Sequence, residues 1–177
     1  MNIQSLLNYS NKKLKQNLIN SAMLDSEILL QKVIKKDRKF LILNSEKNIK
    51  LDKIKIFKTL VSRRQKGEPI SYIINKKEFW NNNFFINSDV LIPRPDSETL
   101  VEQVLKIYDK DAKKKFLDIG TGSGCLLLAI LKERENFFGT GIDISKKALN
   151  VASFNAKVHQ LGNRVKFYNS DVDKFLI

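Results

Sequence analysis

Three of the seven glycines in this 177-residue chain fall within five positions of the stretch FLDIGTGSGCLLLAI (116–130). Gly120, Gly122 and Gly124 follow a short apolar run and precede a longer one. A backbone without side chains can turn tightly, and it lets a ligand approach the main chain closely. Such a turn before a helix is typical of loops that bind nucleotide-like cofactors, although a purely structural tight turn would use the same residues.

The spacing of these glycines narrows the choice of ligand. A dinucleotide-binding loop has the pattern G-x-G-x-x-G, whereas this chain has D-x-G-x-G-x-G and Cys125 in place of the third glycine. Asp143 follows the next apolar run, where it could accept hydrogen bonds from both hydroxyls of a ribose. Asp171 follows a third run, where it could read an adenine amino group. A glycine loop and two acids at three successive strand ends favour S-adenosylmethionine over NAD.

The elements that must position these residues alternate between strand and helix. The sequence predicts strands at 116–119, 138–142 and 165–168, with helices at 125–131 and 146–160 between them. This alternation predicts an α/β fold with a parallel, doubly wound, Rossmann-like sheet and right-handed crossovers. Ligands of that fold bind at the carboxyl ends of the strands, where the glycine loop lies.

The first half of the chain has a different periodicity. Apolar residues recur at helical spacing within 24–34 and 54–61, which predicts a small helical bundle that ends at the breakers 67–69. The stretch EFWNNNFFINSDVLI (78–92) then turns to aromatic residues around an asparagine-rich centre, which predicts a β-hairpin. Two prolines and an amphipathic helix follow in IPRPDSETLVEQVLKIY (92–108).

The composition argues against a membrane protein, a disulfide-bonded protein and a zinc-binding protein. No apolar run reaches the roughly 18 residues of a membrane span, and the N-terminus lacks a signal-peptide pattern, so we expect a cytoplasmic protein that does not enter membranes. One cysteine, Cys125, and one histidine, His159, argue against a disulfide and a zinc site. We therefore expect no metal, a packing role for Cys125 and a surface position for His159.

The net charge of +13 is unevenly distributed. Residues 1–80 carry 18 basic and 7 acidic residues, and residues 81–177 carry 14 and 12, so most of the excess lies in the first half. Lysine supplies 26 of the 32 basic residues, a pattern also expected when coding bias fills solvated surfaces. Two interpretations stay open: solvated helix faces, or a surface that approaches an acidic or phosphate-rich partner.

Five stretches resemble the N-terminal part of the release factor glutamine N5-methyltransferases, also called the HemK or PrmC family. They occur in the order and near the spacing of that family, and together they span nearly all of the chain: RRQKGEPISYI (63–73), FFINSDVLIPRPDSETLVE (84–102), FLDIGTGSGCLLLAI (116–130), GIDIS (141–145) and NSD (169–171). The IPRPDSE segment is the most specific to the family. The resemblance implies methyl transfer from S-adenosylmethionine to the glutamine amide of the Gly-Gly-Gln motif of peptide chain release factors, a step linked to translation termination.

The resemblance also implies an organisation and a set of cofactor-binding residues. A helical substrate-recognition domain would span 1–75, a β-hairpin linker 76–93, and the first half of the methyltransferase domain 94–177. The methionine part of the cofactor would lie along the glycine loop, the ribose at the acid after the second strand, and the adenine at the third strand end. The cofactor-binding residues would be Gly120, Thr121, Gly122, Ser123, Gly124, Asp143, Asp171 and Val172.

The resemblance further implies a catalytic motif that does not occur in this sequence. In the family an Asn-Pro-Pro-Tyr motif holds the substrate amide, but the prolines here are Pro69, Pro93 and Pro95. We therefore expect a chain truncated before the motif and inactive by itself, with no catalytic residue of its own. Arg94 and Glu98 either pair with each other or shape the mouth of the substrate site.

Two other functions stay open. Adenine methyltransferases share a related Asn-Pro-Pro motif, so a basic chain of this kind could belong to an enzyme that methylates an amino group of nucleic acid; the IPRPDSE segment argues against it. A fragment that only binds cofactor or partner is the other alternative.

Overall fold

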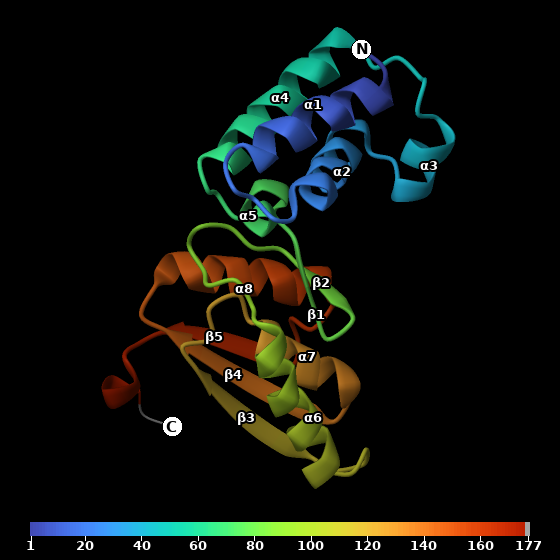
Figure 1. Cartoon of the computed structure of the whole chain (residues 1–177). Helices are drawn as coiled ribbons and strands as arrows, with labels where there is room; N and C mark the ends of the chain where they lie inside the picture. The colour runs from blue at the N-terminus through green and yellow to red at the C-terminus, as the bar shows by residue number, and fades with distance from the viewer. Residues whose placement is uncertain (176–177) are drawn as a thin grey trace. The chain divides into compact units, whose positions relative to one another are not determined.

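The computed structural model describes residues 1–175, and the chain divides into two compact units, Met1–Ile74 and a second unit that begins at Asn75 (Figure 1). Among the described residues, no helix is both long and apolar enough to cross a membrane. The observed architecture confirms the predicted fold class: a helical N-terminal part is followed by a short hairpin and a parallel sheet with helices.

The first unit is a bundle of five helices (Figure 1). Their bounds are α1 Ile3–Lys15, α2 Ala22–Ile34, α3 Arg38–Leu43, α4 Leu51–Gln65 and α5 Ile70–Ile74. Large side chains that are fully buried come from four of them, such as Leu6, Leu29, Phe57 and Ile73. Side-chain caps fix two helix starts, because Asn2 accepts from the N–H of Ser5 and Asp37 from the N–H of Phe40, both at 2.8 Å.

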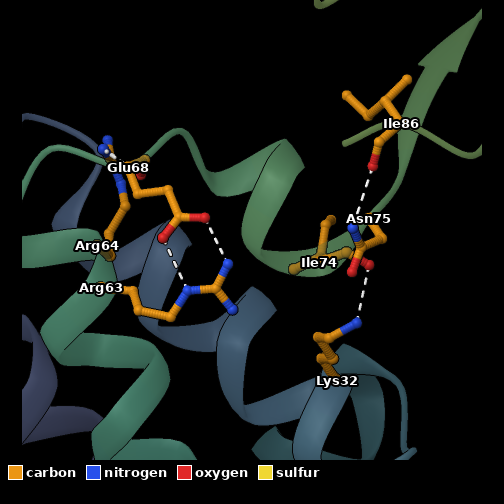
Figure 2. Close-up of polar contacts among 7 residues, drawn as sticks. All are labelled: Lys32, Arg63, Arg64, Glu68, Ile74, Asn75 and Ile86. Atoms are coloured by element: carbon orange, nitrogen blue, oxygen red, sulfur yellow. Dashed lines mark hydrogen bonds and ion pairs between the residues drawn. The ribbon is translucent and has the colours of Figure 1, made fainter. Parts of the chain in front are cut away.

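Arginine–carboxylate pairs tie the helices of this unit together. Arg64 donates to the buried carboxylate of Asp25 at 2.6 Å, which links α4 to α2. Arg63 donates two hydrogen bonds to Glu68, and these lower the pKa of the Glu68 carboxyl (Figure 2). Lys32 donates to the carbonyl of Ile74 at 2.8 Å and holds the end of α5 against α2 (Figure 2).

A two-stranded hairpin opens the second unit. Strands β1 Lys77–Phe79 and β2 Asn82–Phe84 are antiparallel, and their turn residues Trp80 and Asn81 have φ of +48° and +55°. Positive φ at both central residues is the signature of the turn that suits the twist of a two-residue hairpin. The hairpin spans 77–84 and is therefore shorter than the predicted stretch 78–92. Asn82 and Asn83 lie in β2, and residues 85–92 form no strand.

The rest of the second unit alternates helix and strand. After a short 3₁₀ turn, Pro95–Ser97, come α6 Glu98–Ile107, β3 Lys114–Ile119, α7 Cys125–Glu133, β4 Phe137–Asp143, α8 Lys146–Val158 and β5 Val165–Asn169, with a last 3₁₀ turn at Val172–Lys174. The described strands form a parallel sheet in the order β3-β4-β5. Ile119 is opposite Ile142, and Asp143 is opposite Asn169, so the three carboxyl ends meet at one edge of the sheet.

Helices cover one face of this sheet, and the core lies between them and the strands (Figure 1). Leu127, Leu131 and Phe137 are among the buried residues of this layer. On the opposite face Ile119 and Phe138 are 57% and 50% exposed. Parallel sheets normally bury both faces, so the described residues cover only half of what such a sheet requires.

Gly139 in β4 provides a test of the packing between the sheet and α7. A Cβ atom at this position would lie 2.7 Å from Cδ1 of Leu127. We expect Gly139→Ala to lower the free energy of unfolding by about 1 to 2 kcal/mol through overpacking, measured by urea denaturation. Gly162→Ala is the control, because no atom lies within 4 Å of its new Cβ. Equal stability of both variants would show that β4 and α7 are not in close contact.

Candidate functional site

The glycine loop connects β3 to α7 at the carboxyl edge of the sheet. Its glycines all have positive φ: +71° at Gly120, +54° at Gly122 and +76° at Gly124. A Cβ on Gly124 would meet Cβ of Ala152 at 3.2 Å, so this glycine lets α8 pack against the loop. A Cβ on Gly120 would meet no atom within 4 Å, and for a Cβ on Gly122 the nearest atom would be the carbonyl oxygen of Gly120 at 3.9 Å. The first two glycines therefore leave open space next to bare backbone, as a ligand site requires.

Asp143 links this loop to the loop that follows β4. One carboxylate oxygen accepts from the N–H of Gly122 at 2.9 Å, and the other accepts from the N–H of Ser145 at 2.8 Å. Each oxygen of an ionised carboxylate has two lone pairs, so each could still accept from a ligand hydroxyl. The predicted ribose acceptor is thus held rigidly beside the open side of the glycine loop.

The start of α7 adds hydrogen-bond donors to the same edge. Gly124 occupies the N-cap position, and no side chain caps the helix there. The first N–H groups of a helix attract negative charge, so a carboxylate of a bound amino-acid group would be stabilised at this end. Cys125 begins the helix, and burial raises the pKa of its thiol. This agrees with the predicted packing role, because a thiol with a raised pKa is a poor nucleophile.

Asp118 lies beside the glycine loop and is not among the site residues predicted from the sequence. It lies in β3, and its carboxylate accepts from the hydroxyl of Thr121 at 2.7 Å. Burial raises the pKa of Asp118, the Thr121 hydrogen bond opposes this, and the nearby charge of Asp143 raises the pKa further. Two carboxylates so close together favour a positively charged ligand. In the sequence, Asp118 is the acid of the D-x-G-x-G-x-G pattern, which could have marked it as a candidate.

Asp118 gives the chain a predicted dependence of stability on pH. Because its folded-state pKa is raised above its ordinary value of 3.8, the ionised carboxylate costs stability above the folded pKa, and this cost falls as the pH is lowered through it. We expect Asp118→Asn to be more stable than wild type at neutral pH, with a gap that closes toward about pH 4. Urea denaturation at several pH values measures it. A variant less stable at every pH would contradict burial of the charged form.

The predicted adenine-binding residues follow β5. Asn169 donates to the carbonyls of Asp143 and Ile144, both at 2.9 Å, and so ties this strand end to β4. Asp171 is exposed and accepts from the N–H of Asp173 at 3.2 Å, which caps the last 3₁₀ turn. Val172 is 46% exposed. Both residues lie at the predicted edge of the sheet, and their role toward an adenine stays a prediction.

Arg94 and Glu98 were predicted either to pair or to shape a substrate mouth. The carboxylate of Glu98 instead accepts from the backbone N–H of Trp80 at 2.8 Å and so stabilises the hairpin turn. Among the ion pairs of the described residues there is none between Arg94 and Glu98, and Arg94 is exposed. The substrate-mouth role of both stays a prediction.

Two family models match the chain. The model described as the PrmC N-terminal domain matches residues 5–74, and one described as a methyltransferase domain matches residues 110–177. The first match lies within the helical unit, and the second covers the sheet with its glycine loop.

Curated relatives match most of the chain. A protein named release factor glutamine methyltransferase from Coxiella burnetii is 45% identical over 148 residues, which are 84% of this chain and 53% of that protein. Proteins of the same name from Buchnera aphidicola subsp. Baizongia pistaciae and Nitratidesulfovibrio vulgaris are 42% and 33% identical, over 96% and 99% of this chain and 61% and 59% of their own length. The chain thus spans little more than half the length of these relatives.

Solved structures also align with part of the chain. An RNA methyltransferase from Salinibacter ruber, in complex with S-adenosyl-L-homocysteine, is 25% identical, with 48% of this chain and 53% of that chain covered at a TM-score of 0.41. At that score the similarity adds nothing to the fold described above.

Proposed function

Because the chain belongs to the release factor glutamine methyltransferase family, of which it matches the N-terminal part, we propose that it serves the S-adenosylmethionine-dependent methylation of release factors. The acceptor is the side-chain amide of the glutamine in the Gly-Gly-Gln motif. In this reaction the nitrogen–carbon bond to the methyl group forms, the sulfur–carbon bond breaks, and the amide nitrogen loses a proton.

The observation that supports the cofactor assignment is the pair of hydrogen bonds that the carboxylate of Asp143 accepts from the N–H groups of Gly122 and Ser145. The carboxylate thereby lies beside open glycine backbone, between the loops that follow β3 and β4, where we expect it to accept hydrogen bonds from the ribose hydroxyls. The residues fit S-adenosylmethionine in charge as well. Its amino-acid carboxylate suits the uncapped start of α7, and its positive charges suit the carboxylates of Asp118 and Asp143.

The bound cofactor would supply an electrophilic methyl group on a sulfonium, and the residues of this chain would hold and orient it. An amide nitrogen is a poor nucleophile, so catalysis depends on placing it in line with that methyl group in a site that excludes water. In the family the Asn-Pro-Pro-Tyr motif holds the amide, and that motif does not occur among these 177 residues. We therefore assign to this chain cofactor binding and partner recognition and no catalytic residue.

The helical unit is the proposed recognition element for the release factor. It carries 13 Lys and 3 Arg against 6 Asp and Glu. All three arginines pair with acids of the same unit, as Arg38 does with Glu27, whereas its lysines form no ion pair in the described structure. The remaining positive charge is therefore exposed on lysine side chains, which supports binding to an acidic protein surface.

Binding and methyl transfer with methyl-labelled S-adenosylmethionine test this proposal. The chain is offered a release factor, the same factor with Gly-Gly-Ala in place of Gly-Gly-Gln, or duplex DNA. We expect the chain to bind cofactor and both forms of the release factor and to label none of them. Label on the Gly-Gly-Gln factor would refute our assignment of the amide-holding role to the absent motif. Label on DNA would establish the nucleic-acid alternative, and binding of neither cofactor nor release factor would refute the proposal.

A further inference from the structure

Asn155 of α8 is a fully buried polar residue, and both the oxygen and the nitrogen of its side-chain amide form hydrogen bonds. Its oxygen accepts from the N–H of Phe85 at 2.8 Å. Its nitrogen donates to the carbonyl of Phe85 and to the carbonyl of Ser123, both at 2.9 Å. The partners lie 70 and 32 positions away in the sequence, so one side chain joins two distant segments. Buried networks of this kind specify one arrangement because every broken bond leaves an unpaired polar group.

The first of these segments is the glycine loop. Ser123 is buried and lies between two glycines with positive φ. The peptide group from Ser123 to Gly124 is fixed at both ends, because its N–H donates to the carbonyl of Thr121 at 2.8 Å and its C=O accepts from Asn155. This peptide directly precedes the uncapped start of α7. Asn155 therefore helps to set the direction of the donors at that helix start.

The second segment leads from the hairpin toward the predicted substrate mouth. Phe85 follows β2, and its ring packs edge-on against Phe154 with the centroids 5.0 Å apart. Residues 86–94 continue from there to Arg94, with Ile86 held by Asn75 at 3.2 Å (Figure 2). One turn further along α8, a ring nitrogen of His159 lies 3.1 Å from the carbonyl of Asn83. His159 thus contacts β2, two residues before Phe85, and among the hydrogen bonds of the described residues it has none to the glycine loop.

We propose that Asn155 is a positioning residue that links occupancy of the glycine loop to the placement of the segment that leads to Arg94. A ligand that orders the loop orders the carbonyl of Ser123, and through the amide of Asn155 it orders both backbone groups of Phe85. By the reciprocity of linked equilibria, fixing this segment strengthens binding at the loop. This inference rests on the proposed function, since it takes the glycine loop as the cofactor site.

Three variants separate this link from simple packing. Asn155→Ser removes the contacts to both segments. Asn155→Asp keeps an oxygen that accepts from the N–H of Phe85 and loses the nitrogen that donates to the carbonyls of Phe85 and Ser123. His159→Ala is the matched control, because it loosens the same strand and leaves Ser123 in place. Each variant is titrated with S-adenosylhomocysteine, and the exchange rate of the Phe85 amide proton is followed by NMR with and without saturating ligand.

In the wild-type chain we expect ligand to slow exchange at Phe85. Asn155→Ser should bind about 10-fold more weakly and show fast exchange at Phe85 that ligand does not change. In Asn155→Asp, exchange at the Phe85 amide should stay slow without ligand, and added ligand should not slow it further. His159→Ala should bind within about twofold of wild type and keep the effect of ligand.

The outcomes distinguish this inference from the proposed function. A wild-type chain that does not bind the ligand refutes both. Normal binding with no effect of ligand on the Phe85 amide, or with the same effect in Asn155→Ser, refutes the link alone. An unchanged exchange rate at Phe85 in the wild-type chain would refute the link even if the variants at position 155 fail to fold.

Discussion

Asp143→Ala is expected to weaken binding of S-adenosylmethionine about 100-fold. Two hydrogen bonds from ribose hydroxyls to a charged acceptor are lost, at about 1.5 kcal/mol or more each. The N–H groups of Gly122 and Ser145 lose their acceptor at the same time, so the two loops are no longer tied together. Titration calorimetry with the purified chain measures the change.

The control for Asp143→Ala removes the same charge at the edge of the site. Asp173 is exposed and its side chain accepts no hydrogen bond in the described structure, so Asp173→Ala should leave the affinity within about twofold of wild type. Equal affinities for wild type and Asp143→Ala would remove Asp143 from the cofactor site.

Gly122→Ala is expected to abolish detectable cofactor binding, a loss of more than about 100-fold. The φ of +54° costs a side-chain-bearing residue about 1 kcal/mol or more, and the new methyl group would occupy the open side of the loop. The neighbouring protein atoms leave room for it, since the nearest lies at 3.9 Å. The folded chain should therefore tolerate the change much better than the ligand does.

Gly67→Ala is the matched control for backbone strain. Gly67 has φ of +87° and, like Gly122, has room for a new Cβ, with no atom within 4 Å of it, but it lies in the helical unit. We expect a similar loss of stability in both variants, by thermal denaturation, and a loss of binding in Gly122→Ala alone. Normal binding by Gly122→Ala would mean that the loop is only a turn.

Local pattern was sufficient to predict the sheet. The strands at 116–119, 138–142 and 165–168 are continuous apolar runs between breakers, and each was found within two residues of its predicted start. Helix α1 was not singled out, although its buried residues Ile3, Leu6, Leu7 and Leu14 recur at helical spacing. The exact turn of the hairpin was not predicted, because Trp80 is an unusual residue at positive φ and its N–H donates to Glu98, 18 residues away.

The candidate site was only partly predictable for the same reason. The glycine pattern and the acid after each strand are local signals, and they placed Gly122 and Asp143 at the edge where the structure brings them together. Nothing local marks Asn155, whose partners come from other parts of the chain. The second role of Asp143, as acceptor for two backbone N–H groups, also needs the folded loops. Contacts between distant segments are set by tertiary packing, which periodicity does not encode.

The most direct test of the account is an NMR titration of the chain with S-adenosylmethionine that follows every backbone amide. We expect saturable one-to-one binding with a Kd below about 1 mM. The largest shifts should fall at Gly120, Gly122 and the first residues of α7, and at the loop after Asp143. The absence of saturable shifts, or shifts confined to residues outside the carboxyl edge of the sheet, would contradict it.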